Sequence, residues 1–144
     1  FWFRIQDTND VSRFVKQAIA EKQPADFMAV YRSRAYLVEC KTTRNLTAFP
    51  LYYGSTRSIP THQVRAGEFL ERNGGIAYIL IRRDESRNKT VFAITPSQAN
   101  YLYSYYGKKR KSVPWEWFRE NAMEVDRLAK PIRWNLRKLF DSKL

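Results

Sequence analysis

The hydrophobic pattern is clearest between residues 24 and 41, where two short apolar runs flank the polar segment 31–34. This arrangement predicts a β-hairpin that closes at Arg32-Ser33. Because side chains alternate across a strand, Glu39 and Lys41 are expected on one face and Cys40 on the other. Asp26 lies near the start of the partner strand, so the hairpin would bring it beside the Glu39–Lys41 end.

The rest of the chain alternates between strand and helix patterns. Residues 1–5 predict a strand, and the one-sided apolar stripe of 11–22 predicts a helix. Residues 42–60 read as a long irregular loop, followed by a helix over 61–73 with Thr61 as its cap. Residues 76–81 predict a buried central strand and 90–94 its return strand. Further helices are expected over 97–106, capped by Thr95 with Pro96 at its first position, from Trp115, and from Pro131.

These elements predict an α/β (α+β) fold, with a small mixed β-sheet flanked by helices. The length of 144 residues predicts a single domain over 1–144. Its core is expected over about residues 1–95 and a C-terminal helical extension over about 96–144.

Charge narrows the class of partner. The chain carries 26 Lys and Arg against 14 Asp and Glu, a net charge of +12, which indicates a polyanion such as DNA. An anionic membrane surface is disfavoured, because neither end forms a basic amphipathic helix with a strong apolar face. No apolar run approaches the ~18 residues that a spanning helix needs. The single Cys excludes an internal disulfide and a cysteine zinc site, which favours a cytoplasmic protein, nucleoid-associated or viral.

The candidate chemistry lies in the hairpin. Asp26 and Glu39 would place two carboxylates at one end of a basic sheet, with Lys41 beside them, and such a pair suits a hard cation such as Mg²⁺. An Asp at a strand start and a Glu–Lys pair on an exposed strand are also common surface features, and spacing alone does not separate the two readings. Gln63, in the first turn of its helix, reads by spacing as a surface amide.

Candidate nucleic-acid contacts follow along the chain. The loop over 42–60 mixes tyrosines with Arg57, a composition that suits stacking on bases and contact with phosphates. His62 is expected either to contact DNA or to cap its helix. The densest basic run is Lys108, Lys109, Arg110 and Lys111, whose mutual repulsion predicts exposure.

Asp26, preceded by Pro24-Ala25 and followed by Glu39-Cys40-Lys41, resembles the PD-(D/E)xK nuclease signature, with one alanine inserted between Pro and Asp. The segments 41–45, 48–51 and 62–63 further resemble the RecU-type Holliday junction resolvases. The similarity covers roughly residues 1–95. It implies a restriction-endonuclease-like core and a homodimer that cuts four-way DNA junctions with Mg²⁺, for which Mn²⁺ is expected to substitute.

The resemblance also implies roles for individual residues. Asp26, Glu39 and the Cys40 backbone carbonyl would hold the metal, while Lys41 and Gln63 would complete the catalytic group. In that family an acidic residue on an upstream helix commonly joins the metal site. Here it either belongs to a segment before Phe1 or is replaced by Asp7 or by a partner. The expected DNA contacts are Thr43, Arg44, Arg57, His62, Lys108, Lys109, Arg110 and Lys111.

Other functions remain open at this point. One is a different PD-(D/E)xK nuclease of repair or restriction, and the other is a nucleic-acid-binding module that keeps the fold without the chemistry. Basic charge supports each of them as well as it supports a resolvase.

Overall fold

The computed structural model describes residues 2–4, 25–85, 89–128 and 133–142. The predicted helix over 11–22 and the candidate ligand Asp7 lie outside these residues. The elements are, in chain order, β1 Trp2–Arg4, β2 Phe27–Tyr31, β3 Arg34–Thr43, β4 Ala48–Pro50, β5 Tyr52–Tyr53, β6 Thr56–Arg57, α1 Thr61–Arg72, β7 Ile76–Arg83, β8 Thr90–Ile94, α2 Pro96–Tyr105, β9 Ser112–Pro114, α3 Trp115–Asn121, β10 Met123–Glu124, β11 Arg127–Leu128, β12 Arg133–Trp134 and α4 Leu136–Asp141.

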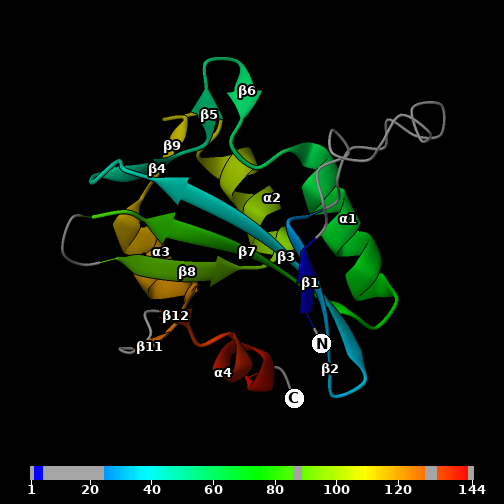
Figure 1. Cartoon of the computed structure of the whole chain (residues 1–144). Helices are drawn as coiled ribbons and strands as arrows, with labels where there is room; N and C mark the ends of the chain where they lie inside the picture. Colours follow the sequence, from blue (N-terminus) through cyan, green and yellow to red (C-terminus); the bar gives the residue numbers. More distant parts are fainter. Residues whose placement is uncertain (1, 5–24, 86–88, 129–132, 143–144) are drawn as a thin grey trace, which may run out of the picture.

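A mixed sheet of six strands, in the order β1-β2-β3-β7-β8-β10, forms the centre of the molecule (Figure 1). Only the β3–β7 pair in this sheet is parallel among the described strands, and the other neighbours run antiparallel. The predicted α/β class with a mixed sheet is therefore confirmed.

The β2–β3 hairpin forms as predicted. Its register pairs Phe27 with Val38 and Tyr31 with Arg34, and the turn is made by Arg32 and Ser33. Both turn residues have positive φ, 47° and 61°, the geometry of a two-residue turn that matches the twist of the strands. This register fixes which β3 side chains face each layer of the protein.

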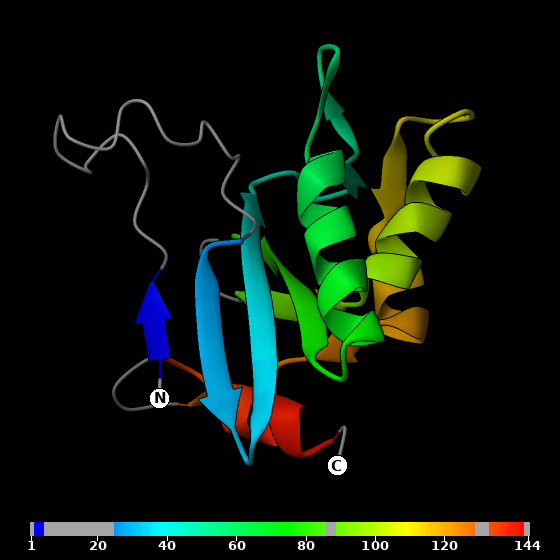
Figure 2. The same cartoon turned by 90° about the vertical axis from the view of Figure 1, so that its right-hand side faces the viewer.

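Helices α1, α2 and α3 cover one face of the sheet, and α4 covers the other (Figures 1 and 2). The first face buries Phe49, Ile81, Leu102 and Trp115 in one cluster. The opposite face buries Tyr36, Tyr78 and Phe140, with the Tyr36 and Phe140 rings stacked 4.0 Å apart. Segments after residue 95 thus contribute to both layers of the core.

Helix α1 packs closely on the sheet because residue 67 is glycine. A Cβ added there would lie 2.7 Å from Pro96 Cγ and 3.0 Å from Ala77 Cβ, too near for a side chain. Gly67 thus lets α1 approach both β7 and the start of α2. Within the described residues no helix is both long and apolar enough to cross a bilayer.

Three details of the sequence-based prediction were wrong. The segment 42–60 is not simply irregular, because β3 extends to Thr43 and β4, β5 and β6 follow it. Thr61 does not cap α1: Pro60 occupies the N-cap position without a side-chain hydrogen bond, and Thr61 Oγ1 instead accepts one from Arg57 at 2.6 Å. The last helix begins at Leu136 with Asn135 as its cap, because Arg133–Trp134 pair as a strand with Arg127–Leu128.

Candidate active site

Asp26 lies immediately before β2, and the antiparallel register places it opposite Glu39. Its Oδ2 accepts a hydrogen bond of 2.8 Å from the Cys40 backbone N–H. In a strand the N–H and C=O of one residue point to the same neighbouring strand, so the Cys40 carbonyl also points toward Asp26. The first predicted carboxylate therefore lies at the end of the hairpin where the sequence placed it.

Glu39 is only 4% exposed, although it is a charged residue. The Lys41 ammonium lies 2.5 Å from its Oε1, which confirms that the two side chains share a face of β3. Burial raises the pKa of the Glu39 carboxyl above its ordinary value of 4.5, and the nearby Asp26 carboxylate raises it further. The Lys41 ammonium acts in the opposite direction, but burial is the larger effect.

Gln63, in the first turn of α1, completes this group. Its amide contacts the Glu39 carboxyl and lowers the pKa of that group. Both residues line a small cavity of about 10 Å³ between α1 and the sheet, which has room for roughly one water molecule. The structure thus places Gln63 beside the acidic pair, where spacing alone predicted a surface amide.

Two buried oxygen atoms of the residues that line this cavity lack hydrogen-bond partners within the described part of the chain. They are Glu39 Oε2 and Gln63 Oε1. A buried polar atom without a partner costs about 1–3 kcal/mol, so these two oxygens are open to a water molecule or to a bound cation. Carboxylate, amide and carbonyl oxygens are the donors that hard divalent cations prefer, and the residues present therefore fit Mg²⁺ or Mn²⁺.

A third acidic ligand is not found in the part of the chain that the structure describes. No group of three or more His, Cys, Asp or Glu side chains gathers there around one point. The donor set provided by this region consists of Asp26, Glu39 and the Cys40 carbonyl, as the resemblance implies. We name these three residues, together with Lys41 and Gln63, the acidic site.

The predicted DNA contacts are spread over several surfaces. Arg57 and His62 line a hollow of about 500 Å³ at the start of α1. Lys108, Lys109, Arg110 and Lys111 are all exposed in the turn after α2, as predicted. Thr43 is 6% exposed and accepts a hydrogen bond of 3.2 Å from the Asn45 N–H, so its side chain faces the protein and its contact with DNA stays a prediction.

Sequence reasoning missed several cations that the fold brings to these surfaces. Arg65 lines the hollow with Arg57 and His62, and its position one turn after His62 on α1 was the available signal. Arg82 and Lys89 join Arg44 around Asp84, at distances of 3.7, 3.4 and 4.0 Å. Arg82, Asp84 and Lys89 lie in one short polar segment of the sequence, but the addition of Arg44 requires β3 and β7 to pair.

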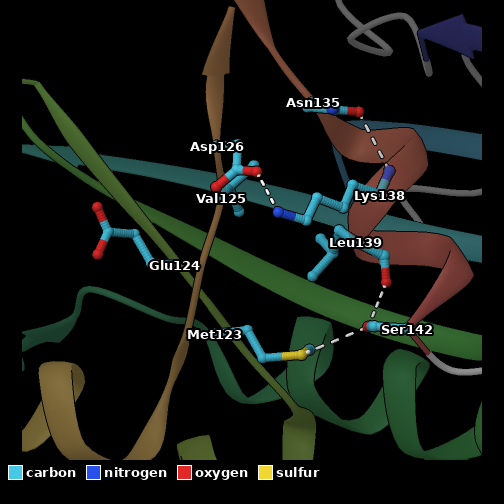
Figure 3. A pocket seen from close by; sticks show the side chains of 8 residues that line it. All are labelled: Met123, Glu124, Val125, Asp126, Asn135, Lys138, Leu139 and Ser142. Atoms are coloured by element: carbon cyan, nitrogen blue, oxygen red, sulfur yellow. Dashed lines mark hydrogen bonds and ion pairs between the residues drawn. The ribbon is translucent and has the colours of Figure 1, made fainter.

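Another hollow, of about 240 Å³, lies between β10 and α4 on the opposite face of the sheet (Figure 3). It is lined largely by apolar atoms, and the ion pair between Lys138 Nζ and Asp126 Oδ2, 2.6 Å long, lies at its edge. Val125 and Leu139, which line it, belong to the core cluster on the face away from Glu39. This hollow is therefore separate from the acidic site.

Comparison with known proteins identifies the family of the chain. The family model described as RecU, Recombination protein U, matches residues 3–139, nearly the whole chain. The chain belongs to the RecU family. Every residue of the acidic site lies within the matched segment.

Curated relatives carry the same family name. A Holliday junction resolvase RecU of Shouchella clausii is 31% identical over 118 residues, which cover 81% of this chain and 49% of the relative. The corresponding protein of Ureaplasma parvum is 28% identical over 114 residues, 78% of this chain and 61% of the relative. A third, from Geobacillus kaustophilus, is 32% identical over 93 residues, which cover 62% of this chain and 42% of the relative. The chain thus spans about half the length of the curated relatives it matches.

Proposed function

We propose that this RecU-family chain is a Mg²⁺-dependent, structure-selective DNA endonuclease that cuts four-way junctions. The observation that carries the proposal is the acidic site, in which Glu39 is kept buried beside Asp26 and Lys41. The relatives' name, Holliday junction resolvase, supplies the substrate class. The net charge of +12 supports a polyanionic substrate.

The proposed reaction is hydrolysis of a phosphodiester. Asp26, Glu39 and the Cys40 carbonyl would hold the cation, which would polarise the phosphoryl oxygen and lower the pKa of water. Lys41 lies beside Glu39 and stabilises the negative charge that develops on the phosphate as water attacks. Gln63 Oε1, which lacks a hydrogen-bond partner among the described residues, accepts one from the attacking water and orients it.

A homodimer follows from the substrate. Resolution of a four-way junction needs two cuts, placed symmetrically on strands of like polarity. Two copies of the chain related by a twofold axis would supply two acidic sites with this symmetry. The partner copy would also be a source of the further acidic ligand that the described residues lack.

The alternative is a DNA-binding module without chemistry. One observation favours this module: the described residues offer only two carboxylates to a metal ion, and one of them is paired with Lys41. This reading predicts tight junction binding with no metal-dependent cleavage.

The deciding experiment incubates a synthetic four-way junction with the protein, with and without Mg²⁺ or Mn²⁺, and maps the products on each strand. We expect paired, symmetric nicks only when the metal is present. Duplex DNA of the same sequence serves as competitor. If duplex and junction are cut and bound equally, the protein is a repair or restriction nuclease instead. If the junction is bound but not cut, the protein is the DNA-binding module without chemistry.

A further inference from the structure

The loop over residues 44–47 directly follows β3, the strand that carries Glu39 and Lys41, and leads into β4. Leu46, within this loop, is 57% exposed, whereas Phe49, three residues later, is 1% exposed. The chain therefore turns Leu46 toward solvent although a large apolar cluster is available a few residues away. A single exposed leucine is common, and what distinguishes this one is how it is held and what surrounds it.

Asn45 holds the loop from within. Its Oδ1 accepts hydrogen bonds from the Thr47 N–H at 3.0 Å, the Thr47 hydroxyl at 2.9 Å and the Ala48 N–H at 3.2 Å. Its own N–H donates to Thr43 Oγ1. One side chain thus sets the path of the backbone on both sides of Leu46.

The loop is also fixed from outside, through the carbonyls that flank the Leu46 side chain. The Trp115 indole N–H donates to the Asn45 carbonyl at 3.1 Å, and the Arg83 guanidinium donates to the Leu46 carbonyl at 2.8 Å. Both donors come from other elements, α3 and β7. The backbone at Leu46 is therefore held in place before any ligand arrives, which reduces the entropy cost of inserting this residue into one.

Charged side chains of both signs adjoin Leu46, and the carboxylates among them, Asp84 and Glu85, are held in ion pairs. Arg44 has a side chain that is 91% exposed, and Arg82 and Lys89 join it around Asp84. A hollow of about 430 Å³ is lined by Arg44, Leu46, Arg83, Asp84 and Glu85. An apolar side chain beside the exposed Arg44 guanidinium matches DNA, in which an apolar base stack lies between two rows of phosphates.

Leu46 lies close enough to the acidic site for one DNA substrate to contact the two. Leu46 lies five positions after Lys41, and at about 3.3 Å per residue the two Cα atoms lie within roughly 17 Å of each other. This is about five steps along a DNA strand of 3.4 Å each. A duplex arm whose phosphate occupies the acidic site can therefore reach Leu46.

We propose that Leu46 is a wedge that enters the base stack within about five base steps of the cut and unstacks it, while Arg44 contacts the adjacent phosphate. The inference rests on the proposed function, since it needs DNA at the acidic site. Unstacking near the crossover would cost less than in a continuous duplex, where every base pair is stacked on two neighbours. The wedge would thereby favour junctions over duplex and assist selection of the cut position.

The test uses the fluorescence of 2-aminopurine, which is quenched by stacking and rises when the base is unstacked. The base is placed at successive positions within about five steps of the crossover of a four-way junction, and protein is added to saturation in EDTA. We expect a position-specific rise with the wild-type chain. For Leu46→Ala the rise should fall by about threefold or more, and Leu46→Met, which restores a long apolar side chain, should recover it.

Phe69→Ala is the matched control, because Phe69 is also an exposed apolar residue, at 69%, but lies on α1 outside the loop. The fluorescence rise with Phe69→Ala should equal the rise with the wild-type chain. The wedge is overturned if wild type binds without any rise, if Leu46→Ala keeps the full rise, or if Phe69→Ala loses as much. A change of oligomeric state in Leu46→Ala, seen by light scattering, would overturn it in favour of a contact between protein chains.

The same samples separate this inference from the proposed function. If Mg²⁺ produces symmetric nicks but no position shows unstacking, the nuclease stands and the wedge fails. If the wild-type chain neither binds nor cuts the junction, both fail together.

Discussion

The acidic site and the basic turn after α2 use charge in opposite ways. Glu39 is buried, is held against Lys41 at 2.5 Å, and keeps an oxygen without a hydrogen-bond partner among the described residues. Lys108, Lys109, Arg110 and Lys111 are exposed on a turn and accessible to the salt solution around them. Glu39 is costly to bury and fixed in position, whereas the basic turn places four cations where water solvates them.

This difference predicts separate roles for the two regions. Buried charges with fixed geometry act on a ligand at short range, where they are little screened. Exposed cations attract a polyanion through counterion release, so their effect depends strongly on salt and weakly on geometry. Substitutions in the acidic site should therefore change chemistry, and substitutions in the basic turn should change affinity.

The largest effect is expected from the carboxylates. Asp26→Ala or Glu39→Ala should reduce junction cleavage below detection, because each removes a ligand of the proposed cation. Binding should persist or tighten, since the removed charge repels phosphate. Glu120→Ala, which deletes an exposed carboxylate on α3, is the control and should cut normally. Mapped products and anisotropy measure the two properties, and undiminished cleavage in either site variant would contradict the assignment.

A smaller loss of cleavage is expected for Lys41. Lys41→Ala should lower the single-turnover rate by on the order of 10²-fold or more, because the developing charge loses its stabilising ammonium. The affinity for Mg²⁺ should not fall, because the removed ammonium repels the cation and occupies Glu39 Oε1, and isothermal titration with Mg²⁺ checks this. A variant that cuts at the wild-type rate would show that Lys41 serves only to pair with Glu39.

A change in affinity without a change in chemistry is expected for the basic turn. Lys108→Ala combined with Lys109→Ala should weaken junction binding and reduce the slope of log K against log salt by about 0.9 for each phosphate that the variant no longer neutralises. Cleavage at saturating protein should remain at the wild-type rate. Arg127→Ala, on the exposed strand β11, removes a cation outside the basic turn and serves as the control, for which we expect an unchanged slope. A slope that does not change would remove the basic turn from the DNA interface.

The smallest effect concerns stability and pH. Because burial raises the pKa of Glu39, the folded state binds this proton more tightly than the unfolded state does. The stability that the proton contributes is complete below the unfolded pKa, near 4.5, and is lost as pH rises through the folded pKa. Glu39→Gln does not titrate and so does not lose this stability. In EDTA, the midpoint temperature of the variant minus that of wild type should therefore increase between about pH 4 and pH 7.

Thermal unfolding followed by circular dichroism measures this gain, and Mg²⁺ should reverse it by stabilising only the wild type. A difference in midpoint temperature that stays constant with pH would mean that Glu39 does not titrate differently in the folded chain.

Local chemistry made much of the fold predictable. The hairpin over 27–43 follows from two apolar runs and a polar turn, and its alternation placed Glu39 and Lys41 on one face. Thr95, Pro96 and Gln98 form the start of α2 as a capping box, which the sequence indicates within four residues. Where local signals compete, prediction failed: Pro131 marks a plausible helix start, but Arg133–Trp134 pair with a strand formed earlier in the chain.

Taken alone, the sequence determined the chemical groups and the strand that carries Glu39 and Lys41, because alternation along a strand is a property of neighbouring residues. Only the tertiary structure decided that Gln63 meets Glu39, that Arg82 and Lys89 join Arg44, and that Trp115 and Arg83 hold the loop of Leu46. These contacts depend on the parallel pairing of β3 with β7 and on the close packing of α1 at Gly67. Residues distant in sequence come together through the burial of the whole sheet, a cooperative property that no short segment encodes.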